Sequence, residues 1–193
     1  TTISTTTTET ATQITSTTHT GTYTSTTPTG TMTTETGETS TEPSKPGPIV
    51  VLFIGDGMGF EHVRGGGYYL NGVEGSLYME SLGGTGQAQT ASLSALTDSA
   101  ASATAMSTGV KTENSRVGQD AHENDLENIL EFAEMYGWSV GVVTTDSVVG
   151  ATPSSFLAHV ATRGDTAGIA AQIIKDPPDV LFGGGFSSLL DSD

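Results

Sequence analysis

From residue 48 onward, apolar runs alternate with amphipathic stretches. Runs at 49–54 (IVVLFI), 138–145 (WSVGVVTT) and 179–182 (DVLF) have the length and the β-branched or apolar content that predict buried strands. Apolar residues at helical spacing predict a helix over 125–136 with Asn124 as its cap, and a helix over 165–175 with Asp165 as its cap. Alternating strands and helices predict an α/β fold with a largely parallel sheet flanked by helices.

An aspartate and a serine precede a run of small residues at 97–112 (TDSAASATAMSTGVKT). The alanines favour helix and the two polar residues favour a cap, so Asp98 and Ser99 are predicted at a helix N-terminus. Unpaired N–H groups there attract an anion, and an activated hydroxyl could attack a phosphate. From spacing alone, a small-residue helix packed on a sheet explains the pattern equally well.

Asp56 follows the first predicted strand directly, within Gly55-Asp56-Gly57-Met58-Gly59. Open α/β sheets place their sites at the carboxyl ends of strands, and glycines allow close approach of a ligand. Taken alone, the segment is equally consistent with a tight turn.

A further helix is predicted over ATPSSFLAHVATR, with Thr152 as its cap and Pro153 at its first position. His159 shares a side with apolar residues, which favours a packed or hydrogen-bonded histidine over a metal ligand. Arg163 has a planar fork suited to phosphate oxygens. Pairing with the C-terminal helix dipole is the alternative for this arginine.

Composition divides the chain into a tail at 1–47 and a globular part at 48–193. Threonine dominates the tail, which has almost no large apolar residues, as is typical of extended, O-glycosylated stalks on secreted proteins. We therefore expect a secreted protein, extracellular or periplasmic. Alternating threonines at 20–26 leave open an ordered strand that joins copies in a homo-oligomer or other assembly.

Charge and composition exclude several function classes. The net charge is −16, from 22 acidic and 6 basic residues, which argues against a nucleic-acid partner. No apolar run reaches membrane-spanning length. The chain contains no cysteine, so disulfides and thiolate metal sites are excluded.

The segments TDSAASATA and STGVKT together resemble the nucleophile region of alkaline phosphatases, and DGMG and ATPSSFLAHVATR are similar to further segments of that family. The likeness extends over about residues 48–190. It implies that Ser99 takes the phosphoryl group from a phosphate monoester substrate. It also implies that Asp98 orients Arg163, which clamps the substrate phosphate.

The same resemblance implies zinc and magnesium as cofactors. By the match, Asp56 bridges a zinc ion and the magnesium site, Ser99 meets zinc, and Thr152 is a magnesium ligand. The family typically has aspartate or histidine two residues before this threonine, whereas this chain has Gly150. We therefore expect weak magnesium binding, and expect Gly150→Asp to strengthen it.

The remaining family ligands have no match in these 193 residues. They are an aspartate and two histidines for one zinc, an aspartate–histidine pair for the other, and a carboxylate for magnesium. None of the four histidines matches a family ligand: His19, His62, His122 and His159. We expect phosphatase activity in a longer parent chain and an inactive isolated chain. The alternative is a secreted structural or assembly subunit with a non-catalytic remnant.

Overall fold

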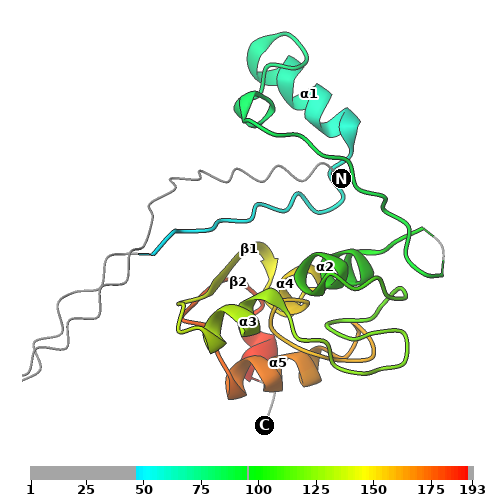
Figure 1. The fold of residues 1–193 in the computed structure, drawn as a ribbon, viewed down its shortest axis with the longest axis vertical. Coiled ribbons are helices and arrows are strands. Elements are labelled where there is room, and N and C mark those ends of the chain that lie inside the picture. The colour runs from blue at the N-terminus through cyan, green and yellow to red at the C-terminus, as the bar shows by residue number, and fades with distance from the viewer. Residues whose placement is uncertain (1–46, 95, 191–193) are drawn as a thin grey trace, which may run out of the picture.

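A computed structural model describes residues 47–94 and 96–190 (Figure 1). Residues 1–46, which carry the predictions on the tail and on His19, lie outside this part. The described elements, in chain order, are α1 (Phe60–Asn71), η1 (Tyr78–Ser81), α2 (Ser99–Thr108), α3 (Ile129–Met135), β1 (Gly141–Ser147), α4 (Ala151–Ser154), α5 (Thr166–Lys175), β2 (Val180–Gly184) and α6 (Phe186–Leu190).

Strands β1 and β2 pair in parallel and confirm the predicted α/β class with helices around a parallel sheet. The register runs from Gly141 opposite Val180 to Val143 opposite Phe182, and an irregularity follows before Ser147. Helices α4 and α5 form the crossover between the two strands. The strands predicted at 138–145 and 179–182 are therefore confirmed in position.

The prediction of buried strands is only partly right. Segments β1 and β2 are strands but are not buried, and segment 49–54 is neither a strand nor buried. Exposed residues occur along both β1 and β2. Segment 49–54 forms no strand, and Ile49 and Phe53 are 89% and 84% exposed. Figure 1 shows this segment (cyan) as an extended trace outside the sheet. A central parallel strand needs neighbours on both edges and cover on both faces, and the described residues provide neither to this run.

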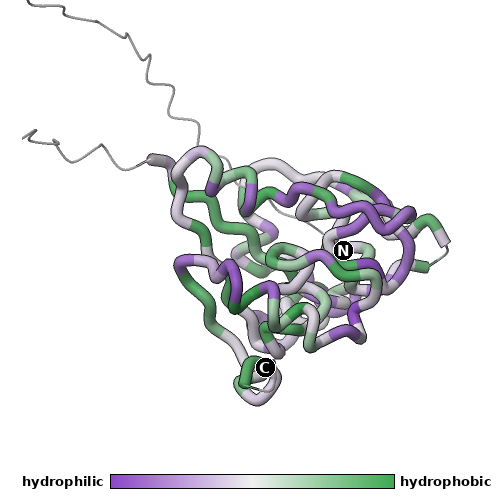
Figure 2. The backbone as a smooth tube through the Cα atoms, turned by 90° about the horizontal axis from the view of Figure 1, so that it is seen from below, coloured by the Kyte–Doolittle hydropathy of each residue, from purple (hydrophilic) through white to green (hydrophobic). Residues whose placement is uncertain are grey.

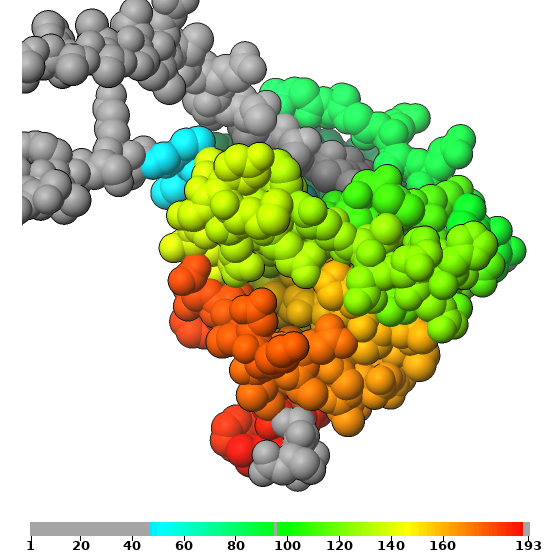
Figure 3. All heavy atoms as spheres, turned by 60° about the horizontal axis from the view of Figure 1, so that its bottom comes forward, coloured from blue at the N-terminus to red at the C-terminus, as the bar shows by residue number. Residues whose placement is uncertain are grey.

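The buried core lies beside the sheet, where α2, α4 and α5 meet. Its cluster consists of small and β-branched residues: Ala100, Val117, Val148, Val149, Ala151, Ala158, Val160, Ile169, Ala170 and Ile173. Figure 3 shows α5 (orange) against the yellow-green region that contains α3 and β1, with α6 (red) protruding. Hydrophobic stretches also reach the outline of the molecule (Figure 2), and α1 extends away from the core (Figure 1).

Capping residues explain where two of the predicted helices begin. The Asp98 side chain accepts a hydrogen bond from the Ala101 N–H and caps α2, which ends at Gly109 with φ 74°. Asp165 caps α5 in the same way through the Gly168 N–H. Both helices are confirmed.

The helix predicted from residue 125 starts later than expected. Asn128, not Asn124, is the N-cap of α3, and Glu131 completes a capping box with it. Residues before this cap are held in a turn, since Asn124 and His122 donate backbone N–H groups to the Asp120 carboxylate. The Asn124 side chain also donates to the Asp120 carboxylate, so Asn124 belongs to this turn and the helix begins only after Asn128.

The helix predicted from Thr152 is much shorter than expected. Gly150 is the N-cap of α4, so Thr152 lies inside the helix, which ends at Ser154. Beyond it, Val160 exchanges two backbone hydrogen bonds with Val117, of 2.9 and 3.1 Å. This antiparallel bridge requires extended backbone and so prevents continuation of the helix. No helix in residues 47–94 or 96–190 is long and apolar enough to cross a bilayer.

Candidate active site

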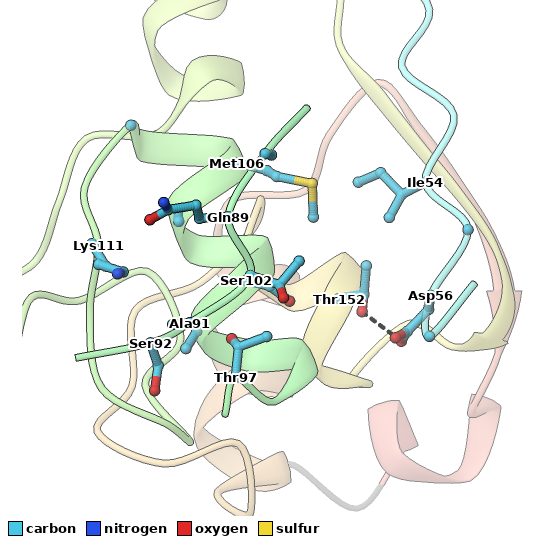
Figure 4. A pocket seen from close by; sticks show the side chains of 17 residues that line it. Ile54, Asp56, Gln89, Ala91, Ser92, Thr97, Ser102, Met106, Lys111 and Thr152 are labelled. Carbon is cyan, nitrogen blue, oxygen red and sulfur yellow. Dashed lines mark hydrogen bonds between the residues drawn. The ribbon is translucent and has the colours of Figure 1, made fainter. Parts of the chain in front are cut away.

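The Asp56 carboxylate lies between two hydroxyl groups that come from distant parts of the chain. The Ser99 Oγ donates to Asp56 Oδ1 at 2.9 Å, and the Thr152 Oγ1 donates to Asp56 Oδ2 at 2.8 Å. Figure 4 shows Asp56 facing Thr152. Three residues selected from separate motifs in the sequence are thus brought into direct contact.

Local structure explains how Asp56 reaches this position. It sits in a turn in which the Met58 N–H donates to the Gly55 carbonyl at 3.1 Å. Gly57 has φ 64°, a left-handed conformation that favours glycine over residues with a side chain. The turn directs the aspartate at α2 and α4 rather than away from them.

Helices α2 and α4 hold Ser99 and Thr152 in register through buried hydroxyls. The Ser107 Oγ donates to the Ser155 carbonyl at 2.6 Å, and Thr104 and Ser155 share a 3.3 Å contact between hydroxyl oxygens. Small side chains let the two helices approach closely. The positions of the site hydroxyls follow from this packing.

Asp98 and Arg163 form the second pair of the site. Asp98 Oδ1 accepts the Ala101 N–H at 2.9 Å, while Oδ2 accepts the Ser115 N–H at 3.0 Å and lies 3.4 Å from Arg163 Nη1. The Arg163 N–H also donates to the Ser115 carbonyl at 2.8 Å. The Arg163 side chain remains 42% exposed, so its guanidinium is accessible to a ligand.

Sequence reasoning missed two residues that hold Asp98. The Asp98 N–H donates to Asn114 Oδ1 at 3.2 Å, and the Asn114 amide donates to the Leu96 carbonyl at 2.9 Å. Ser115 has φ 73°, an uncommon value for a residue with a side chain. Both residues lie in a polar segment whose sequence predicts only a loop, and no motif or spacing in it identifies them as residues of the site.

A cavity of about 320 Å³ lies against this site and is lined in part by Asp56 and Thr152. Its remaining wall includes Ala101 and Met106 of α2, together with Lys111 (Figure 4). The carboxylate and the hydroxyl therefore lie at the edge of a recess.

His159 is a hydrogen-bonded structural residue, as predicted. Its Nδ1 lies 2.8 Å from the Gly118 carbonyl, and its Nε2 lies 2.7 Å from Glu131 Oε1. Burial lowers the pKa of His159, but the hydrogen bonds to Gly118 and Glu131 outweigh it, so the pKa is raised above 6.5. Glu131 holds this ring and also accepts the Asn128 N–H at the start of α3. His62 is exposed.

The side-chain atoms of Asp56, Ser99 and Thr152 indicate which metal ions the predicted metal site could bind. Asp56, Ser99 and Thr152 present only oxygen atoms, which suits magnesium, an ion that keeps several water ligands. Zinc usually takes three protein ligands in catalytic sites, and the match offers it Asp56 and Ser99 alone. Within the described ranges, no three His, Cys, Asp or Glu side chains are grouped as a metal site.

The sequence is similar to those of known phosphatases. A family profile described as alkaline phosphatase matches residues 49–193. Streptomycin-6-phosphate phosphatase of Streptomyces griseus is 38% identical over 175 residues, covering 76% of this chain and 39% of that protein.

Two solved structures are similar in fold. The cold-active alkaline phosphatase of a psychrophilic Shewanella species aligns with a TM-score of 0.59 at 33% identity, over 68% of this chain and 35% of its own. A variant of the TAB5 alkaline phosphatase, solved with magnesium in its M3 site, aligns with a TM-score of 0.51 at 38% identity. This alignment covers 52% of this chain and 29% of that chain. The chain thus spans less than half the length of these relatives.

Proposed function

Because the chain belongs to the alkaline phosphatase family, we propose that it forms part of a longer enzyme that hydrolyses phosphate monoesters through a phosphoserine at Ser99. The contact of the Asp56 carboxylate with both Ser99 and Thr152 is the observation that carries this proposal. It joins three sequence motifs at one point, beside a second pair, Asp98 and Arg163, that suits phosphate binding.

The reaction is proposed to proceed in two displacements. Ser99 Oγ forms a bond to phosphorus as the bond from phosphorus to the ester oxygen breaks, and the departing alcohol takes up a proton. Water then forms a bond to the same phosphorus and releases the Ser99 oxygen, which regains a proton. Ser99 is the first residue of α2, where unpaired N–H groups and the helix dipole favour the phosphate anion.

Arg163 and Asp98 are proposed to bind and orient the phosphoryl group. Guanidinium donors can contact two phosphate oxygens at once, and they stabilise the charge that the group carries during transfer. Asp98 holds Arg163 from one side while it caps α2, so the arginine and Ser99 are fixed to the same helix end.

Magnesium fits the oxygen donors of Asp56 and Thr152, which we propose as its ligands. When bound, the ion would balance the negative charge that gathers at a carboxylate and a phosphate. Zinc is also implied by the family, but the described residues do not complete a zinc site. We propose that the longer parent chain supplies the missing ligands.

The proposal is tested by Ser99→Ala in the full-length protein, with an aryl phosphate as substrate and zinc and magnesium present. Hydrolysis should be nearly abolished, and the phosphoserine that mass spectrometry detects at residue 99 should disappear. Ser102→Ala is the matched control, because that hydroxyl donates to carbonyls of its own helix and not to Asp56. Full activity of Ser99→Ala would refute the nucleophile assignment.

We further propose a location outside the cytoplasm, in line with the threonine-rich tail. A full-length protein that binds no metal and hydrolyses no phosphate monoester would instead support the structural or assembly subunit.

A further inference from the structure

Gly150 lacks a side chain, yet the space beside it is filled. It caps α4 two residues before Thr152. A Cβ atom added at Gly150 would lie 2.9 Å from Asp146 Oδ2, 2.9 Å from the Ser147 carbonyl oxygen and 3.5 Å from Asp146 Cγ. A carbon atom does not normally approach an oxygen atom so closely, so the Asp146 carboxylate and the Ser147 carbonyl already occupy the place of a side chain at position 150.

The turn between β1 and α4 produces this arrangement. Asp146 stands one residue before the end of β1, and the Gly150 N–H donates to the Ser147 carbonyl at 2.8 Å. The turn thereby folds the end of the strand back onto the start of the helix. A Cβ atom added at Gly183 or Gly184 of β2 would lie 3.2 or 3.3 Å from the Asp146 carbonyl oxygen.

The Asp146 carboxylate has no polar partner in the part of the chain that the structure describes. Within residues 47–94 and 96–190 it takes part in no hydrogen bond or ion pair, although the Asp146 N–H donates to Thr144 Oγ1. The residue is exposed and lies near the carboxyl end of a parallel strand, where α/β folds gather their ligands. Its negative charge has no fixed counter-charge.

We propose that Asp146 supplies the carboxylate that Gly150 cannot, and that it acts on the same magnesium ion as Asp56 and Thr152, directly or through a water molecule of that ion. This inference rests on the proposed function, since that function assigns magnesium to Asp56 and Thr152. Asp146 is a metal-positioning residue rather than a catalytic one.

The inference changes what is expected of substitutions at position 150. Considered alone, Gly150→Asp adds an oxygen ligand and should strengthen magnesium binding. With Asp146 in place, the new side chain meets an existing carboxylate at close range, and the two like charges repel. Gly150→Asp should then fail to strengthen binding, unless Asp146 is removed at the same time.

The experiment measures magnesium affinity of the full-length protein by calorimetry, with magnesium chloride as the probe. Asp146→Asn should weaken binding roughly 10- to 100-fold, the usual loss for a residue that supports a metal site. Asp146→Ser combined with Gly150→Asp should recover part of it, because serine vacates the space that the Asp146 carboxylate occupies. Asp176→Asn is the control, since that exposed aspartate lies at the C-terminal end of α5, away from the site. Melting curves and a second variant, Asp146→Ser, guard against misfolding.

Two outcomes would overturn the inference alone: unchanged affinity in Asp146→Asn while Asp56→Asn loses magnesium, or stronger binding in Gly150→Asp with Asp146 intact. Either would leave the proposed function standing. A parent protein without measurable magnesium affinity would refute the magnesium site of the proposed function, and the role of Asp146 with it.

Discussion

The Asp98 carboxylate lies 3.4 Å from the Arg163 guanidinium while its other oxygen caps α2. The Asp98 side chain thus joins the start of α2 to Arg163, which lies 65 residues after Asp98 in the chain. The ion pair is partly exposed, with side-chain exposures of 42% for Arg163 and 24% for Asp98. Its contribution to orienting the arginine is therefore modest.

Asp98→Asn should separate the capping role from the ion pair. The amide oxygen can still accept the Ala101 N–H, so the cap of α2 is kept. The amide nitrogen then faces the Ser115 N–H, which loses its acceptor, so the melting temperature should fall somewhat. The charge that holds Arg163 is lost as well. The inhibition constant for inorganic phosphate should rise by roughly two- to fivefold, in line with exposed ion pairs.

The matched control is Asp165→Asn, which alters the N-cap of α5 in the same way but has no arginine partner. The inhibition constant of inorganic phosphate for Asp165→Asn should equal that for the parent protein. An unchanged phosphate inhibition constant in Asp98→Asn would show that Arg163 is held by other contacts, such as its backbone bond to Ser115.

How much of the site could be read from the sequence depends on whether a residue acts within a motif. Asp56, Ser99 and Thr152 stand in long motifs whose resemblance to one family is specific, and the structure places them in contact. Asn114 and Asp146 stand outside such motifs, and their positions depend on loops that fold back over a helix start. Local sequence patterns do not show which loop residues lie next to the start of a helix.

For the fold, strand and helix positions were easier to predict than burial. The apolar run at 49–54 has the composition of a buried strand, but burial depends on what packs against it, and the described residues offer no neighbour. Helix α3 starts late because Asn124 is held in a turn by the Asp120 carboxylate, and helix α4 ends early because Val160 pairs with Val117. A local turn decided the first boundary, and a tertiary contact decided the second.

Thr104→Val should lower the free energy of unfolding by about 1–3 kcal/mol, the cost of leaving a buried polar group without its partner. The fully buried Thr104 hydroxyl accepts the Gly118 N–H at 3.0 Å and lies 3.1 Å from the Arg116 carbonyl. Valine keeps the shape and removes the hydroxyl. Denaturant unfolding of the full-length protein gives the measurement.

Thr145→Val, on the exposed side of β1, is the control for the threonine-to-valine change and should be nearly neutral. Equal stabilities of the two variants would mean that water satisfies the Gly118 N–H after the substitution.

The ion pair of His159 and Glu131 should make stability depend on pH. Because the folded-state pKa of His159 is raised above 6.5, the stabilisation is fully present below pH 6.5 and is lost as the pH rises through the higher value. Asp125 adds to this attraction. The melting temperature should therefore fall toward alkaline pH by more in the parent than in Glu131→Gln.

Glu127→Gln removes an exposed carboxylate just before the same helix and is the control. It should keep the pH dependence of the parent. If Glu131→Gln shows the same slope as the parent, then His159 does not titrate in this range.

A protein made of residues 1–193 alone should show almost no phosphatase activity, even with zinc and magnesium added. The match assigns zinc only the Asp56 carboxylate and the Ser99 hydroxyl, whereas catalytic zinc usually has three protein ligands. In the described part the serine has Asp56 as its hydrogen-bond acceptor, but nothing there replaces a metal in activating both the hydroxyl and the attacking water. Hydrolysis of an aryl phosphate at alkaline pH, measured beside the full-length protein, is the assay. Zinc-dependent turnover that is lost in Ser99→Ala would show that these residues are sufficient after all.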